Sequence, residues 1–115
     1  MSLARPVDLV HLSRYTGGDR SINAEVLTLF ASQSAELIDK LGAALNQSDA
    51  KTWRDITHSL KGGARGIGAF SLADVVAEAE TANPAEDQGR AARILLDLRS
   101  RASAVTLFID AYLGR

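Results

Sequence analysis

The sequence predicts an all-α protein, an antiparallel up-down four-helix bundle with a short additional N-terminal helix. Apolar residues recur at three- and four-residue spacing along most of the chain, which is typical of helices that bury one face. The chain has only two prolines, and its turn-forming residues gather in short segments between the periodic ones. Short loops between long helices favour antiparallel neighbours. A length of 115 residues suits a single domain over residues 1–115.

The first two predicted helices are a short one over about residues 8–15 and a long one over about residues 19–46. In the short helix, Leu9 and Leu12 share the inward face. The glycines at 17 and 18 supply a turn, and Asp19 can cap the first free amides of the long helix. The inward face of the long helix carries Leu27, Phe30, Leu37, Ile38, Leu41 and Leu45.

A third helix is expected after residues 47–49, where Asp49 can act as its cap, and glycines 66 and 68 should close it. Residues 71–74 resemble a capping box that opens a fourth helix, which the Asn83-Pro84 pair should stop. The last helix should run to about residue 112. The inward residues are Trp53, Ile56, Leu60, Ala64 and Ile67 in the third helix, Leu72, Val75, Val76 and Ala79 in the fourth, and Ala91, Ile94, Leu95, Leu98, Val105, Phe108 and Tyr112 in the last.

Composition excludes several classes of function. The 13 basic and 14 acidic side chains give a net charge of −1, which argues against bulk nucleic-acid binding. The chain has no cysteine and two histidines, so neither a disulfide scaffold nor a His-rich metal site is expected. No apolar run approaches the roughly 20 residues of a membrane span, and no signal-peptide pattern opens the chain. We therefore expect a cytoplasmic protein that binds no metal, nucleic acid or membrane.

The chemistry-bearing segment lies around His58 in the third helix. At about 100° per residue, the apolar positions fall within an arc of roughly 80°, and His58 lies about 140° from Trp53, outside that arc. Arg54, Lys61 and Arg65 lie within roughly 60° of His58. A free imidazole is largely neutral near pH 7 and is then a competent nucleophile. Lys61 at i+3 could neutralise a phosphoryl group held there.

Gly62 removes a side chain one turn from His58, where an incoming protein would approach. Glycine within a helix costs about 1 kcal/mol relative to alanine, so Gly62 and Gly63 each need a reason. Close helix packing is the preferred reason for Gly63, which leans toward the core. Each feature also has a simpler interpretation, because a lone exposed histidine and a basic helix face are usually only solvated. By the same reasoning His11 is a surface or bundle-end residue, and Trp53 belongs to the core.

The combination resembles the histidine-containing phosphotransfer (HPt) domain family. The string from His58 to Gly62 matches the family's His-x-x-Lys-Gly core, and Gly68 and Leu72 follow at the family spacing. The Gly-Gly-Asp turn before the long helix and the Ala-Glu-Ala-Glu-Thr-Ala string at residues 77–82 are also similar to the family. The resemblance extends through most of the chain.

This resemblance implies that His58 accepts a phosphoryl group from a receiver domain's aspartyl phosphate, or from a histidine kinase, and passes it to another receiver. Lys61 takes the role of the family lysine, and Gly62 that of the close-approach glycine. Some members place a glutamine near the histidine, and the nearest equivalent here is Glu80. A carboxylate there would repel phosphate, so that role is not transferred to Glu80.

The implied partners are response-regulator receiver domains and a hybrid histidine kinase, and the chain itself is expected to be a monomer. Arg54 and Arg65 would complement a receiver's acidic pocket. The receiver would supply Mg²⁺, so no cofactor is expected in this chain, and no phosphate-loop or kinase motif is present for ATP. Two alternatives stay open: a helical module that binds receivers or kinases without accepting phosphate, and a generic helical adaptor or nucleic-acid module.

Overall fold

The computed structural model describes residues 5–115, and within that range it contains α-helices and no strand. The predicted all-α bundle with a short leading helix is confirmed. The predicted single domain over residues 1–115 stays a prediction. The helices are α1 (Leu9–Thr16), α2 (Arg20–Asn46), α3 (Ala50–Gly66), α4 (Phe70–Glu80) and α5 (Gln88–Leu113).

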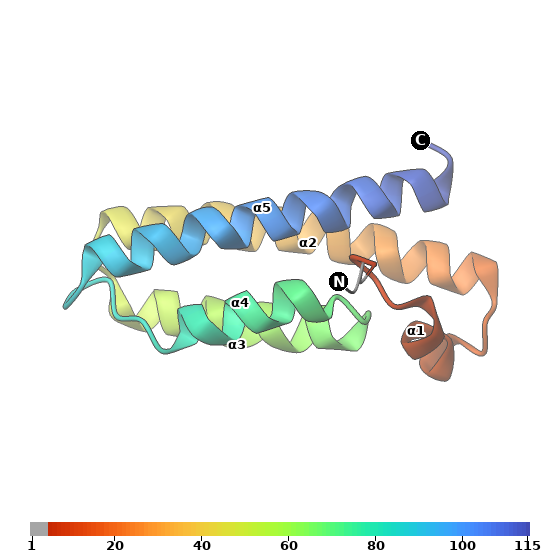
Figure 1. The fold of residues 1–115 in the computed structure, drawn as a ribbon, viewed down its shortest axis with the longest axis horizontal. Helices are drawn as coiled ribbons and strands as arrows, with labels where there is room; N and C mark the ends of the chain where they lie inside the picture. The colour runs from red at the N-terminus through yellow and green to blue at the C-terminus, as the bar shows by residue number, and fades with distance from the viewer. Residues whose placement is uncertain (1–4) are drawn as a thin grey trace.

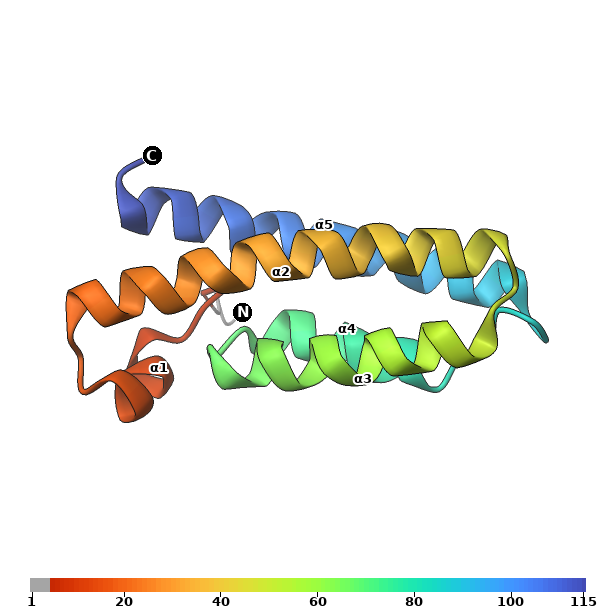
Figure 2. The same cartoon turned by 180° about the vertical axis from the view of Figure 1, so that it is seen from behind.

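The four longer helices pack in chain order around the bundle, so that α3 lies between α2 and α4, and α5 closes the ring against α2 (Figures 1 and 2). The helices α2 and α5 are longer than α3 and α4 and project beyond them at one end. The short helix α1 lies beside that projecting end and packs on α2 (Figure 1). Bundle and leading helix together therefore surround one core.

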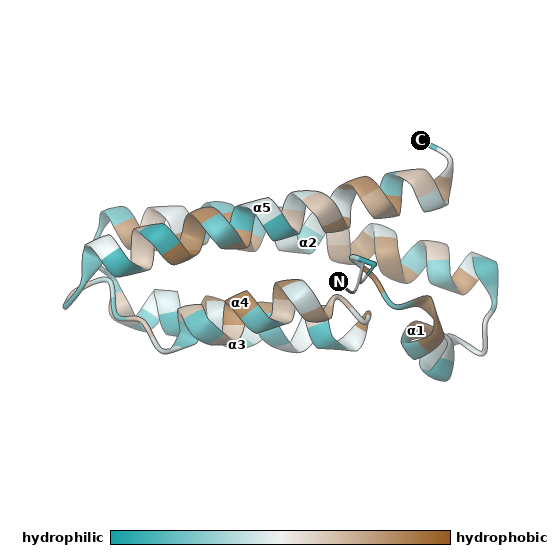
Figure 3. Ribbon diagram, viewed as in Figure 1, coloured by the Kyte–Doolittle hydropathy of each residue, from teal (hydrophilic) through white to brown (hydrophobic). Residues whose placement is uncertain are grey.

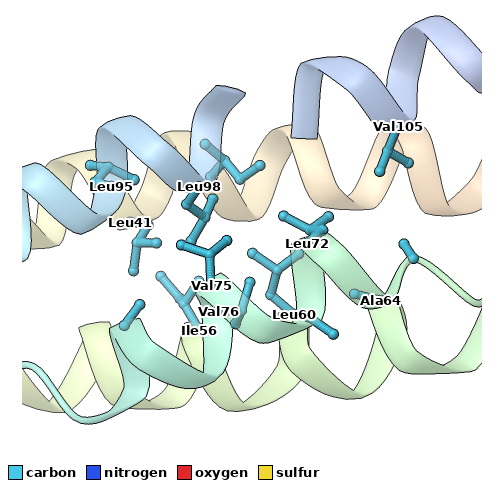
Figure 4. Packing of buried hydrophobic residues seen from close by; sticks show 14 of the residues in the cluster. Leu41, Ile56, Leu60, Ala64, Leu72, Val75, Val76, Leu95, Leu98 and Val105 are labelled. Atoms are coloured by element: carbon cyan, nitrogen blue, oxygen red, sulfur yellow. The ribbon is translucent and has the colours of Figure 1, made fainter. Parts of the chain in front are cut away.

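The core is built from the apolar faces that the periodicity predicts. Brown and teal residues alternate along the helices in Figure 3, and Figure 4 shows side chains of α4, among them Leu72 and Val75, lying beside Leu60 of α3. Trp53, Leu60, Leu72 and Leu98 are fully buried. Five residues expected to face inward are only partly buried at the edge of this core, namely Leu9, Leu37, Leu45, Phe108 and Tyr112.

Two of the predicted helix caps are present. The side chain of Asp19 accepts a hydrogen bond from the amide of Ile22, and that of Asp49 accepts one from the amide of Thr52. An N-terminal turn leaves several amides without helical partners, and a capping side chain is worth about 1 kcal/mol. The long helix and the third helix thus begin where the sequence indicates.

The predicted start of α4 is wrong. The helix begins at Phe70, with Ala69 as the preceding residue, and no side chain caps it. Ser71 therefore lies inside the first turn, and the proposed capping box over residues 71–74 does not form. The physical reason is the tight turn before it, in which the amide of Ala69 bonds to the carbonyl of Ala64 and the helix follows at once.

The end of α4 also differs from the prediction, because the helix stops at Glu80, before the Asn83-Pro84 pair. In a continuing helix the carbonyl of Ala79 would accept the amide of Asn83. Instead it accepts the amide of Ala82 at 3.0 Å and the indole Nε1–H of Trp53 at 2.8 Å. The contact with Trp53 of α3 therefore lies where α4 ends, ahead of the Asn83-Pro84 pair.

Gly68 joins α1 to the turn between α3 and α4. Its φ of +80° lies in the left-handed region, and its carbonyl accepts the amide of Asp8 at 2.9 Å. A Cβ at this position would lie 2.7 Å from the carbonyl oxygen of Asp8. Both backbone conformation and close approach therefore require glycine here.

We predict that Gly68→Ala lowers the free energy of unfolding by at least about 1–2 kcal/mol, the cost of a non-glycine residue in the left-handed region. Gly66→Ala is the matched control, because Gly66 is helical and a Cβ there meets open space, so stability should stay equal or rise. Urea denaturation followed by circular dichroism measures both. Equal stability of the two variants would contradict the role assigned to Gly68.

Candidate functional site

His58 stands exposed in the middle of α3. Its side chain is 77% accessible, while Ile56 and Leu60 beside it are buried. The reason is the helical periodicity, since α3 turns its apolar face to the core and leaves His58 on the other side. The exposed position predicted for the histidine is confirmed.

Helix α4 brings a carboxylate to this histidine. The indole of Trp53, buried in α3, donates to the carbonyl of Ala79 and so holds the C-terminal end of α4 against α3. The next residue along α4 is Glu80, which therefore lies at the junction of the two helices. Figure 1 shows α3 and α4 running side by side over this stretch.

Glu80 connects two residues of α3. Its Oε2 lies 3.3 Å from Nδ1 of His58, and its Oε1 accepts a hydrogen bond from Nζ of Lys61 at 2.5 Å. The Lys61 side chain is only 19% exposed and that of Glu80 25%. Although the helical wheel placed Lys61 beside His58 on the exposed side, its ammonium group is turned to α4.

The hydrogen bond from Lys61 holds the pKa of Glu80 below its ordinary value; burial opposes this, and the hydrogen bond with His58 adds to the lowering. Glu80 is therefore a carboxylate at neutral pH and can only accept hydrogen bonds. A hydrogen bond between it and Nδ1 requires the proton to be on Nδ1. The lone pair of the neutral ring is then on Nε2, the nitrogen that Glu80 does not contact, and it is available for nucleophilic attack.

The surroundings of His58 are of mixed charge. Arg54, Asp55, Ser59 and Glu80 line a shallow depression with the histidine. Asp55 also pairs with Lys51 at 2.8 Å. The structure thus brings Arg54 to the histidine. Arg65 is exposed in the last turn of α3 and does not line this depression. The basic face expected from Arg54, Lys61 and Arg65 is interrupted, because Glu80 neutralises Lys61.

The two adjacent glycines of α3 have different environments. A Cβ on Gly63 would lie 3.4 Å from the ring of Phe30 in α2, which is an ordinary van der Waals contact, so the packing explanation for Gly63 stays a prediction. A Cβ on Gly62 would meet nothing within 4 Å. Gly62 therefore has no packing reason within the described residues and leaves an open surface one turn from His58.

The sequence also predicts where His11 and Trp53 lie. His11 lies half-buried at one end of the bundle, where its ring packs edge-to-face on Tyr15 and Phe70. Trp53 is fully buried and belongs to the core. Both outcomes match the sequence interpretation.

Glu80 is the residue of this site that sequence reasoning passed over. An isolated carboxylate would repel phosphate, but this one is paired with Lys61. A signal was available in Lys61, an opposite charge one turn from the histidine, but the pairing depends on how α4 lies against α3. Among residues 5–115, no group of three His, Asp or Glu side chains is arranged to hold a metal ion.

The chain belongs to the Hpt domain family, whose model matches residues 25–111. Members of this family are phosphocarriers that act in two-component signalling with receiver domains and histidine kinases. The chain is also similar to the crystal structure of histidine-containing phosphotransfer protein B (HptB) from Pseudomonas aeruginosa PAO1. That comparison has a TM-score of 0.85 and 26% sequence identity, and it covers 94% of each chain.

No curated protein matches the chain at a significant level. In the part of the chain that the structure describes, no helix has both the length and the apolar character of a membrane span.

We predict that the carboxyl group of Glu80 titrates below its ordinary value of 4.5, and that Lys61→Ala raises its pKa, because the lysine hydrogen bond is the largest cause of the lowering. Since the folded-state pKa is depressed, ionised Glu80 stabilises the fold above the ordinary value, and this contribution is lost as pH falls through the lowered pKa. Carbon-13 NMR titration of the glutamate carboxyls measures the shift.

The matched control for this titration is Lys51→Ala. It removes the lysine of the separate Lys51–Asp55 pair and should leave Glu80 unchanged. A Glu80 titration that Lys61→Ala does not move would show that the contact between Lys61 and Glu80 is absent in solution.

Proposed function

We propose that this chain carries a phosphoryl group on Nε2 of His58 within a two-component phosphorelay. It takes the group from the aspartyl phosphate of a receiver domain, or from a histidine kinase, and passes it to another receiver. The observation that supports this most is an exposed histidine on α3 of an Hpt bundle, whose Nδ1 is in hydrogen-bond contact with Glu80. Membership of the Hpt family supplies the reaction class.

Phosphoryl transfer requires the chain mainly to hold His58 in position. The Nε2 lone pair forms the N–P bond while the P–O bond to the donor aspartate breaks, and the electron pair of that bond stays on the aspartate. The receiver provides Mg²⁺ and the acidic pocket, so the bundle acts as a carrier and binds no cofactor of its own. Holding the nucleophile on a packed helix reduces the entropy cost of reaching the reactive geometry.

Lys61 acts in this proposal through charge. Its ammonium group neutralises the carboxylate of Glu80, so the dianionic phosphoryl group does not meet an unbalanced negative charge beside His58. The same ammonium group, one turn from the histidine, stabilises the charge that develops on the transferring oxygens.

Three residues of α3 recognise the receiver in this proposal, namely Gly62, Arg54 and Arg65. Gly62 allows close approach of the partner's backbone. The two arginines complement the acidic residues around the receiver's aspartate and act mainly on the association rate. We infer that the bundle works as a monomer in the cytoplasm. Its complexes with each partner form and dissociate repeatedly, as transfer between partners requires.

We predict that a cognate kinase or phosphorylated receiver labels this protein on His58. His58→Ala should abolish the label, whereas His11→Ala should retain it, because His11 packs on Tyr15 and Phe70 at one end of the bundle. The label should be lost in acid and kept in base, as for a phosphoramidate. Binding of a receiver without any label would instead support the non-phosphorylated interaction module.

We predict that Gly62→Gln slows phosphoryl transfer at least about tenfold, which corresponds to 1.4 kcal/mol in the barrier. Gly62→Ala should have a much smaller effect, because a methyl group protrudes less into the partner's approach. Both variants should fold at least as stably as the parent, since glycine is a poor helix former. Single-turnover transfer to a receiver measures the rates. Equal rates for the Gln and Ala variants would remove the close-approach role.

A further inference from the structure

The acid beside His58 is held in a defined arrangement. Glu80 contacts Nδ1 of His58 with one oxygen and Lys61 with the other, and both partners of this ion pair are largely covered. A carboxylate fixed in this way keeps its charge and its direction. Its contact with Nδ1 therefore affects whether that nitrogen keeps its proton during the reaction.

Phosphorylation changes the charge of the ring. When the Nε2 lone pair of neutral His58 forms the N–P bond, the proton on Nδ1 stays in place, and the ring becomes a cationic imidazolium that carries the phosphoryl group. The ring can then keep that proton or lose it to water. The two forms differ in charge by one unit, and a nearby carboxylate favours the cationic one.

The two forms also differ as donors. In the onward step the N–P bond breaks and its electron pair returns to Nε2. If Nδ1 is protonated, the leaving group is neutral imidazole. If Nδ1 has lost its proton, the leaving group is an imidazolate anion, which leaves far more slowly. The protonation of Nδ1 therefore decides how readily the phosphoryl group moves to the next receiver.

We propose that Glu80 is a positioning residue that holds the Nδ1 proton of His58, both before phosphorylation and on the phosphorylated ring, and thereby keeps phospho-His58 a ready donor. This inference rests on the proposed function for the identity of the acceptor. It assigns to the acid at position 80 a role that a neutral amide could fill only in part, because an amide can accept the hydrogen bond but carries no charge.

The other charges around the ring do not replace Glu80. Arg54 and Asp55 of α3 line the same depression and are of opposite sign. Lys61 disfavours a cationic ring, but its ammonium group is bound to the oxygen of Glu80 that does not contact His58. From α4, Glu80 lines this depression, and it is the group in hydrogen-bond contact with Nδ1.

The first test reads the ring tautomer without any phosphoryl group. Nitrogen-15 NMR of the intact protein should show the proton of neutral His58 on Nδ1. Glu80→Gln should weaken that preference, and Glu80→Ala should abolish it in favour of Nε2–H. Glu78→Gln is the matched control, because Glu78 is an exposed glutamate two residues away on the same helix. An Nε2–H tautomer in the parent protein would overturn the proposal.

The second test measures lability. The protein is phosphorylated chemically with phosphoramidate in a His11→Gln background, which leaves His58 as the single histidine. Loss of the phosphoryl group is then followed by phosphorus-31 NMR between pH 6 and pH 10. In the parent, hydrolysis should slow as the pH rises and Nδ1 of the phosphorylated ring loses its proton. In Glu80→Gln the midpoint of this change should lie about one pH unit lower, so that above both midpoints the variant hydrolyses about tenfold more slowly. The Glu78→Gln profile should match the parent.

Coincident pH profiles for the parent and Glu80→Gln would overturn the inference. Because the chemical donor needs no partner, this outcome is separate from the proposed function. If no kinase or receiver labels His58, the phosphorelay assignment fails, whereas the tautomer and the pH profile still decide the role of Glu80. Circular dichroism of each variant confirms that it is folded.

Discussion

A single buried hydrogen bond, from the indole of Trp53 in α3 to the carbonyl of Ala79 in α4, positions the parts of the candidate site. Its acceptor is the carbonyl of the residue before Glu80, with which α4 ends. It also joins the end of α4 to the first turn of α3. The carboxylate that contacts His58 is therefore placed by a bond made inside the core, whose donor is fully buried.

The charges at the site balance each other locally. An exposed nucleophile that receives a dianionic group requires neighbours that do not repel it, yet the ring requires an acceptor for its second nitrogen. Glu80 meets the second requirement and Lys61 offsets its charge, and both are largely covered by the α3–α4 interface. Partial burial strengthens this pairing, because a contact with less water around it is screened less.

Three glycines near the site have three different surroundings. Gly68 has a positive φ and meets the backbone of Asp8, so it fixes the turn from which α4 starts. A Cβ on Gly63 would contact the ring of Phe30 in α2, whereas Gly62 faces open space. The residue type is the same in all three cases, and only the surroundings differ. Gly62 lies one turn along α3 from His58, and both residues are exposed.

The sequence by itself determined the helices, two of their caps and the side of α3 on which His58 lies, because these follow from periodicity and from bonds within a few residues. The helical wheel also indicated the side on which Gly63 lies, where a Cβ would contact Phe30 of α2. The tertiary structure alone decided where α4 begins and ends, that Lys61 turns to α4, and that Glu80 contacts His58. A helical wheel describes one helix at a time. Residues 58 and 80 meet only through the register of α3 against α4, which is set by packing between side chains far apart in the chain.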